Sequence, residues 1–248
     1  AVLGYAQTFY MLPISLFGIS VAASELPELS RMRVEEEQVL ASRVSTALRR
    51  VSFFVIPSAA VYLVLGDVVV AAVFQTGAFG SVETLVTWGV LGAYAIGLPA
   101  SASSRVLSSA FYALRDTKTP AKIAYIRIVV SIVIGLLLMI PLDDLGFVQL
   151  RLGAAGLALG ASAGAWLEYV LLRRSLRVMI GAHGPGSSAV LRVMLAATLA
   201  VGSGVLLQLT LPAAHPIVLG VATLIPTGLV YVATAAFLGE KFSDRVRR

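Results

Sequence analysis

The residues of this chain that could do chemistry are ionisable side chains placed inside otherwise apolar stretches: Arg49, Arg50, Arg105 and Glu168. Cysteine is absent, and the two histidines lie in segments that contain Gly and Pro. Thiol chemistry, cysteine metal clusters and catalytic triads therefore lack their residues. A guanidinium forms parallel hydrogen bonds with phosphate oxygens. These residues predict the binding of an anion, with no enzymatic activity and no cofactor.

Each of these side chains has more than one interpretation. Arg49 and Arg50 point about 100° apart on a helix, so one can reach lipid headgroups while the other faces inward. Arg105, in SASSRVLSS, is expected to pair with a carboxylate or a helix carbonyl, because an unpaired charge is costly in a bilayer. Glu168 is the leading partner, and a water-filled cavity around Arg105 would make it a substrate contact instead. For Glu168 itself, an ion pair or a snorkelling acid is favoured over a proton relay.

The surrounding sequence is that of a membrane protein. Hydrophobic residues make up 58% and charged residues 13% of the 248 residues, with a mean hydropathy of +0.90, whereas soluble domains carry about 25% charge. A span needs about 20 apolar residues. The stretch Val68 to Phe79 is too short to cross and predicts an interfacial or re-entrant segment. We therefore predict an all-α polytopic membrane protein with about seven spans, at residues 1–24, 47–66, 84–112, 119–142, 148–172, 188–211 and 215–239.

The distribution of basic residues predicts the orientation. Of the 19 Lys and Arg residues, 17 fall on one side of this layout and Arg151 alone falls on the other. Because basic loops stay cytoplasmic, we expect Lys118, Lys241 and the C-terminus inside the cell, and Asp143 and His215 outside. The net charge of +6 and pI near 9.9 then report topology, and nucleic acid is not expected as a partner.

Two local patterns concern helix ends and helix contacts. Thr119 followed by Pro120 predicts a helix start, with Thr119 as the N-cap. Gly156, Gly160 and Gly164 recur every four residues, which predicts a face that another helix can approach closely. Ordinary bundle packing is the favoured interpretation of these glycines, over a substrate groove.

Four segments, in order, resemble a known family. They are GYAQTFYMLPISLFGISVAASELPELSR, FQTGAFGS, YAIGLPASASSRVLSSAFYALRDTKTPAKIA and GAAGLALGASAG. Together they resemble the MurJ (MviN) lipid II flippases of the MOP superfamily, over about residues 1–175. The FYALRDTKTP block is the most specific of these matches.

The resemblance implies the organisation of the chain. Residues 1–175 would form the C-terminal lobe of a MOP-type fold, with five spans and a cytoplasmic amphipathic connection at 25–46. Residues 176–248 would add C-terminal membrane helices and a basic cytoplasmic tail. The chain opens inside an apolar stretch, which we interpret as the C-terminal half of a transporter. The N-terminal lobe, truncated or separately encoded, would be a partner.

The resemblance also implies a function. A MurJ-type protein in the inner (plasma) membrane would move lipid II, or a related polyprenyl-diphosphate lipid, to the outer leaflet by alternating access, without making or breaking a bond. In ALRRVSFFVIP, Arg49 matches the family's cavity arginine, and Arg50 and Arg105 are further expected substrate contacts. The first span has no acid, so a sodium site of the family's design is not expected.

Three alternatives stay open at this point. Another polyprenyl-linked oligosaccharide exporter or a MOP antiporter would have a cavity lined by acids. A structural membrane subunit would have no cavity. Membrane lipids are expected partners in every case.

Overall fold

A computed structural model describes residues 2–19, 37–75, 79–144, 153–211 and 215–246. Within these ranges the chain is helical and contains no strand. Six helices are long and apolar enough to cross a membrane, and a shorter apolar segment covers Val2–Phe17. The prediction of an all-α polytopic membrane protein is confirmed, with roughly the expected number of spans. The elements are α1 (Val2–Pro13), the π-helix η1 (Ile14–Ile19), α3 (Glu37–Val64), α4 (Gly66–Phe74), α5 (Ser81–Ala113), α6 (Lys118–Asp144), α7 (Gly153–Ile180), α8 (Ser187–Thr210) and α9 (Pro216–Val246).

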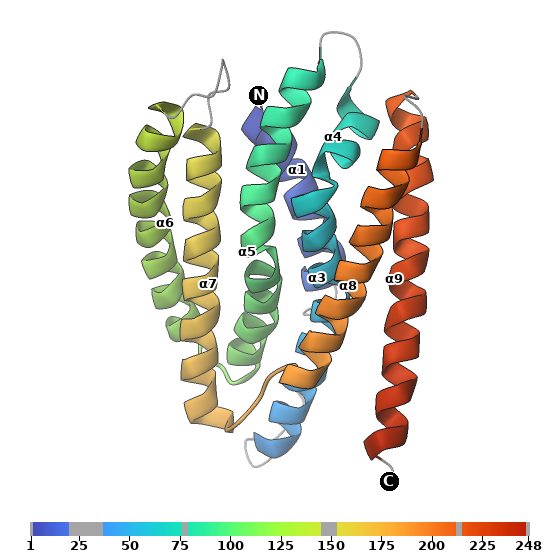
Figure 1. Cartoon of the computed structure of the whole chain (residues 1–248). Coiled ribbons are helices and arrows are strands. Elements are labelled where there is room, and N and C mark those ends of the chain that lie inside the picture. Colours follow the sequence, from blue (N-terminus) through green and yellow to red (C-terminus); the bar gives the residue numbers. More distant parts are fainter. Residues whose placement is uncertain (1, 20–36, 76–78, 145–152, 212–214, 247–248) are drawn as a thin grey trace.

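The long helices stand roughly parallel and form a curved row (Figure 1). Along this row α6 contacts α7, α7 contacts α5, α5 contacts α3, α3 contacts α8, and α8 contacts α9. Helix α1 lies against α5, and α4 lies between α5 and α9. The row therefore has an α5–α6–α7 side and an α3–α8–α9 side, which differ in the way their helices meet.

Several basic and acidic residues lie at opposite ends of the row. The α5–α6 turn with Lys118, the end of α7 with Arg173, and the end of α9 all lie at one end (Figure 1). The end of α6 with Asp143 and the start of α5 with Glu83 lie at the other. This is the separation that the count of basic residues predicts.

Helix α3 begins earlier than predicted. It starts at Glu37, ten residues before the expected span, so residues 37–46 of the predicted connection at 25–46 belong to the helix. Residues 20–36 lie outside the described ranges. Leu40, Val44, Leu48 and Val51 are buried at intervals of three and four residues, the period of an apolar helix face. Arg43, Arg49 and Arg50 lie between these positions. The apolar periodicity is therefore hard to recognise in the sequence.

The short apolar stretch after α3 forms the nine-residue helix α4, which at about 1.5 Å per residue is too short to cross a bilayer. Gly66 opens it, and a Cβ there would clash with the Trp88 ring. The Trp88 indole donates to the carbonyls of Tyr62 and Leu63, at 3.2 and 3.3 Å. Because this indole lies over Gly66 and bonds to the last turn of α3, it stabilises the break between α3 and α4.

The FYALRDTKTP block forms the tight turn between α5 and α6. Arg115 has a left-handed backbone with φ 60°, and the N–H groups of Arg115 and Asp116 donate to the carbonyls of Tyr112 and Phe111. This is a Schellman motif. The Asp116 carboxylate then accepts from the N–H groups of Lys118 and Thr119, both at 3.0 Å. The prediction of Thr119 as N-cap is therefore wrong, because Asp116 supplies the cap and the helix already includes Thr119.

The glycine face of α7 packs against α6, as predicted. A Cβ at Gly156 would lie 2.7 Å from the backbone of Leu138 and Met139, and one at Gly160 would clash with the backbone of Gly135. The two helices therefore approach closely because both faces carry small residues.

The ends of α7 and α9 differ from the expected boundaries. Helix α7 runs to Ile180, so the division expected after residue 175 falls inside it. Helix α9 continues to Val246, so most of the predicted tail is helical. The division into a lobe and additional helices stays a prediction.

Candidate functional site

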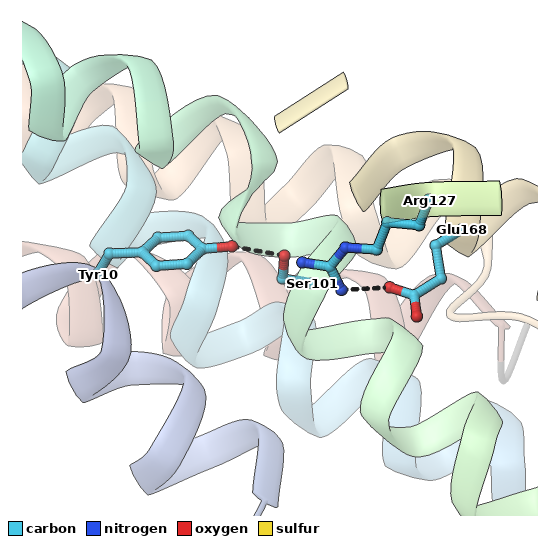
Figure 2. Close-up of polar contacts among 4 residues, drawn as sticks. All are labelled: Tyr10, Ser101, Arg127 and Glu168. Carbon is cyan, nitrogen blue, oxygen red and sulfur yellow. Dashed lines mark hydrogen bonds and ion pairs between the residues drawn. The ribbon is translucent and has the colours of Figure 1, made fainter. Parts of the chain in front are cut away.

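An ion pair joins two helices within the apolar bundle. The Arg127 Nη1 atom of α6 lies 2.6 Å from the Glu168 Oε2 atom of α7 (Figure 2). The side chains are 28% and 11% exposed. Arg127 is nine residues into α6, roughly 13 Å along its axis, so the pair lies well inside the span. It supplies each charge with a partner where water is scarce.

A second polar contact lies beside this pair. The Tyr10 hydroxyl of α1 and the Ser101 hydroxyl of α5 are 2.5 Å apart, and both residues are buried. Figure 2 shows this contact next to the Arg127–Glu168 pair. Side chains of α1, α5, α6 and α7 thus form one polar cluster.

The expected pairing of Arg105 with Glu168 is wrong, because Glu168 pairs with Arg127. Glu168 continues the four-residue series of Gly160 and Gly164, so it faces α6 and not α5. Arg105 is exposed on α5 and makes no hydrogen bond or ion pair with another described residue. The predicted ion-pair role of Glu168 is found, with a different arginine.

Arg127 is not among the residues that the sequence analysis singles out, because it follows the basic turn around Lys118 by only nine residues. The sequence does contain a signal for it. Arg127, Ser131 and Gly135 recur every four residues on α6, opposite the series on α7. A Cβ at Gly164 would clash with the Ser131 hydroxyl, and one step further along both series Glu168 meets Arg127.

A serine side chain of α7 forms hydrogen bonds with two backbone groups of α5. Ser162 donates to the Ala93 carbonyl at 2.6 Å and accepts from the Gly97 N–H at 3.1 Å, which are the two groups that a regular helix would join. A Cβ at Gly97 would lie 2.6 Å from the Ser162 Cα. Pro99, two residues on, has no N–H to donate. The backbone hydrogen bonding of α5 is therefore interrupted at the GLP segment, and the Ser162 side chain of α7 bridges the interruption.

Arg49 lies in a different place from this cluster. It lines a pocket of about 240 Å³ between α3, α8 and α9, together with Phe53 and Arg192. We call this the Arg49 pocket. Arg49 is exposed and has no hydrogen-bond partner among the described residues. Arg50 is also exposed but is not among the lining residues.

An apolar groove begins next to the Arg49 pocket. It has a volume of about 510 Å³ and runs between α1, α3, α8 and α9. Aromatic and aliphatic side chains dominate its lining, and Phe53 lines both the groove and the Arg49 pocket. An apolar groove that shares Phe53 with a pocket containing two arginines suits a ligand that has a long apolar chain and an anionic head.

The described ranges contain no cluster of three or more His, Asp or Glu residues that could hold a metal ion.

These features define the class of the protein as a polytopic α-helical membrane protein with paired charges inside the bundle and an apolar groove beside an arginine pocket. A family model described as "Lipid II flippase MurJ" matches residues 1–228. The chain belongs to this family.

Curated relatives agree with the family assignment. The chain is 30% identical over 173 residues to a probable lipid II flippase MurJ of Rickettsia prowazekii, covering 69% of this chain and 32% of the relative. It is 32% identical over 176 residues to lipid II flippase MurJ of Burkholderia cenocepacia, covering 71% and 32%. The chain therefore spans about a third of the length of these relatives.

A solved structure shares the fold. It is described as lipid II flippase MurJ in an inward closed conformation, with a TM-score of 0.73 and 23% identity, and the match covers all of this chain and 48% of that one. The likeness supports the arrangement of helices in Figure 1.

Proposed function

We propose that this chain is part of a lipid II flippase that moves the polyprenyl-diphosphate precursor from the inner to the outer leaflet of the inner (plasma) membrane. Membership of the MurJ family supports the substrate class. The observation that carries the proposal in this chain is the apolar groove that shares Phe53 with the Arg49 pocket.

The two sites match the two parts of such a lipid. A polyprenyl chain gains free energy by leaving water for apolar surface, and the groove between α1, α3, α8 and α9 offers that surface. A diphosphate needs paired donors, which Arg49 and Arg192 supply in the pocket beside the groove. In this proposal Arg49 holds the diphosphate, Arg50 remains near the headgroups, and the exposed Arg105 is a further substrate contact.

The positive charge of the Arg49 pocket favours a flippase over an antiporter. Binding of a cationic substrate would require acids in the pocket, but its described lining residues include two arginines and no carboxylate. A purely structural subunit would gain nothing from an arginine pocket joined to an open groove.

The proposal includes an orientation and a partner. The basic end of the bundle would face the cytoplasm, with Lys118 and the C-terminus on that side. A second lobe would face this one, and rocking of the two lobes would expose the lipid to each side in turn. No nucleic acid takes part.

The first experiment compares two conservative variants in the complete two-lobe protein. Arg49→Lys keeps the charge but replaces a bidentate fork by a point donor, so we expect it to lose most of the activity. Arg50→Lys should retain it. The measurements are appearance of lipid II in the outer leaflet and rescue of a strain depleted of its own flippase. Equal loss at both positions would contradict a specific role for Arg49.

The second experiment tests the groove. Gly228 lines it, and a Cβ there would meet no atom within 4 Å. Gly228→Leu should therefore obstruct the groove and reduce lipid II transport without lowering stability. Gly202→Leu is the control, because Gly202 lies on α8 with the same free space and is not among the groove's lining residues. Full activity of Gly228→Leu would argue against lipid in the groove.

A further inference from the structure

A separate pocket lies at the basic end of α7. It has a volume of about 450 Å³, and Arg173, Arg174, Arg177 and His183 line it together with Tyr169. We call this the Arg173 pocket. It is formed by the last turns of α7 and the link to α8, and it shares no lining residue with the groove or the Arg49 pocket. Three guanidinium groups therefore surround one small volume.

One of these arginines is held in place. Arg173 donates to the Tyr169 hydroxyl at 3.4 Å and to the His183 carbonyl at 3.3 Å, and its guanidinium carbon lies 6.0 Å from the centre of the Tyr169 ring. A Cβ at Gly184 would lie 2.5 Å from the Arg173 Nη2 atom. Gly184 has φ 151°, so both space and backbone favour glycine there.

The link that forms the pocket is anchored to another helix. The Gly184 N–H donates to the Ser45 hydroxyl of α3 at 3.1 Å, and the Gly181 N–H closes α7 by donating to the Arg177 carbonyl at 3.0 Å. The walls of the pocket are therefore fixed before any ligand binds, which lowers the entropic cost of binding.

The other two arginines lack a partner among the described residues. Arg174 and Arg177 are exposed and make no hydrogen bond or ion pair within the described part of the chain. The described residues that line the pocket include no carboxylate. Attraction to the carbonyl end of α7 explains cations near this position, but it does not explain three of them around one hollow.

His183 gives an independent indication of a ligand in this pocket. It is only 8% exposed, and its Nδ1 atom lies 3.0 Å from the Gly181 carbonyl, so Nδ1 carries the donating hydrogen. The Nε2 atom is buried without a partner, which is unusual for a polar atom. Burial, followed by the charges of Arg173 and Arg177, lowers the pKa of His183. An anion among the arginines would offset their effect on the ring.

We propose that the Arg173 pocket binds a phosphate group. The phosphate can belong to the headgroup of an anionic phospholipid in the leaflet next to this end of the bundle, or to a soluble phosphate compound. Basic pockets at the ends of membrane helices suit such headgroups. The proposal does not depend on lipid II transport, because the pocket shares no lining residue with the groove or the Arg49 pocket.

The test measures lipid retention by the protein in nanodiscs of phosphatidylcholine, with and without phosphatidylglycerol. Native mass spectrometry after release counts the bound lipids. The variant Arg174→Gln with Arg177→Gln should lose at least tenfold in affinity for phosphatidylglycerol. Arg173 is left intact because it holds the link. The matched control, Lys118→Gln with Lys122→Gln, removes two charges exposed at the same end and should change affinity less than twofold.

Inorganic phosphate distinguishes the two sources. If millimolar phosphate displaces the lipid from the wild type, the pocket recognises a phosphate that a soluble compound can supply. If it does not, the phospholipid is the ligand. Equal losses in the two double variants would overturn the proposal in favour of general surface charge. Absence of both lipid retention and phosphate binding in a folded wild type would also overturn it.

Discussion

The α5–α6–α7 side and the α3–α8–α9 side of the bundle hold their helices together differently. On the first side the backbones approach closely at glycines, and polar side chains bond from one helix to another. On the second side the hydroxyls of Thr198, Ser203 and Thr234 bond to carbonyls of their own helix. The apolar groove opens on the second side.

This difference has a physical reason. In a bilayer, apolar contact gives little net attraction between helices, so close packing and interhelical hydrogen bonds must hold them. The first side has both. The second side has fewer of these contacts, among them the packing of Gly204 against Thr227 and the Tyr231 hydroxyl that donates to the Phe53 carbonyl. The groove between α3, α8 and α9 leaves room there for a ligand. We therefore expect substitutions to affect stability mainly on the first side and transport mainly on the second.

The largest expected effect comes from the Arg127–Glu168 pair. Glu168→Ala or Arg127→Ala leaves a charge without its partner among the apolar helices and should cost about 3 to 5 kcal/mol of unfolding free energy. The double variant Arg127→Met with Glu168→Met removes both charges and should recover most of the loss. Unfolding free energies measured in bicelles test this. If the double variant lost as much as the two single variants combined, the pair would not be coupled.

The next effect concerns glycines on the two sides. Gly160→Ala places a methyl group against the backbone of α6 and should cost about 1 to 3 kcal/mol, as overpacking does. Gly202→Ala on α8 meets no atom within 4 Å and should be neutral or slightly stabilising. The same unfolding measurement compares them. Similar losses at both positions would remove the distinction between the two sides.

A smaller effect is expected for serines on the two sides. Ser162→Ala removes the group that joins the Gly97 N–H and the Ala93 carbonyl of α5 and should cost about 1 kcal/mol. Ser203→Ala removes a bond within α8 only and should change little. Hydrogen exchange at Gly97 provides a local readout, and it should rise only in Ser162→Ala. No change in exchange at Gly97 would mean that its N–H bonds directly to the Ala93 carbonyl when Ser162 is removed.

The sequence predicted the pattern of elements better than the pairing of polar groups. The apolar stretches gave the helices, and the four-residue glycine series gave the close face of α7, because both are properties of one segment. The partner of Glu168 depends on how α6 and α7 are aligned. To predict it, the four-residue series of α6 must be compared with that of α7. Arg192, which shares the Arg49 pocket, comes from α8, and no spacing along the chain connects it with Arg49.

The smallest expected effect is at the α5–α6 turn and depends on pH. Hydrogen bonds from Thr119 lower the pKa of the Asp116 carboxyl below its ordinary value of 3.8. The charged cap therefore stabilises α6 above that value, and its contribution is lost as the pH falls through the lowered pKa. In Asp116→Asn the amide oxygen still accepts hydrogen bonds but does not titrate. We expect the variant to have a slightly lower Tm near neutral pH and a flatter dependence of Tm on pH below about 5. Equal slopes in the variant and the wild type would show that the Asp116 charge does not stabilise the turn, and that its backbone geometry does so instead.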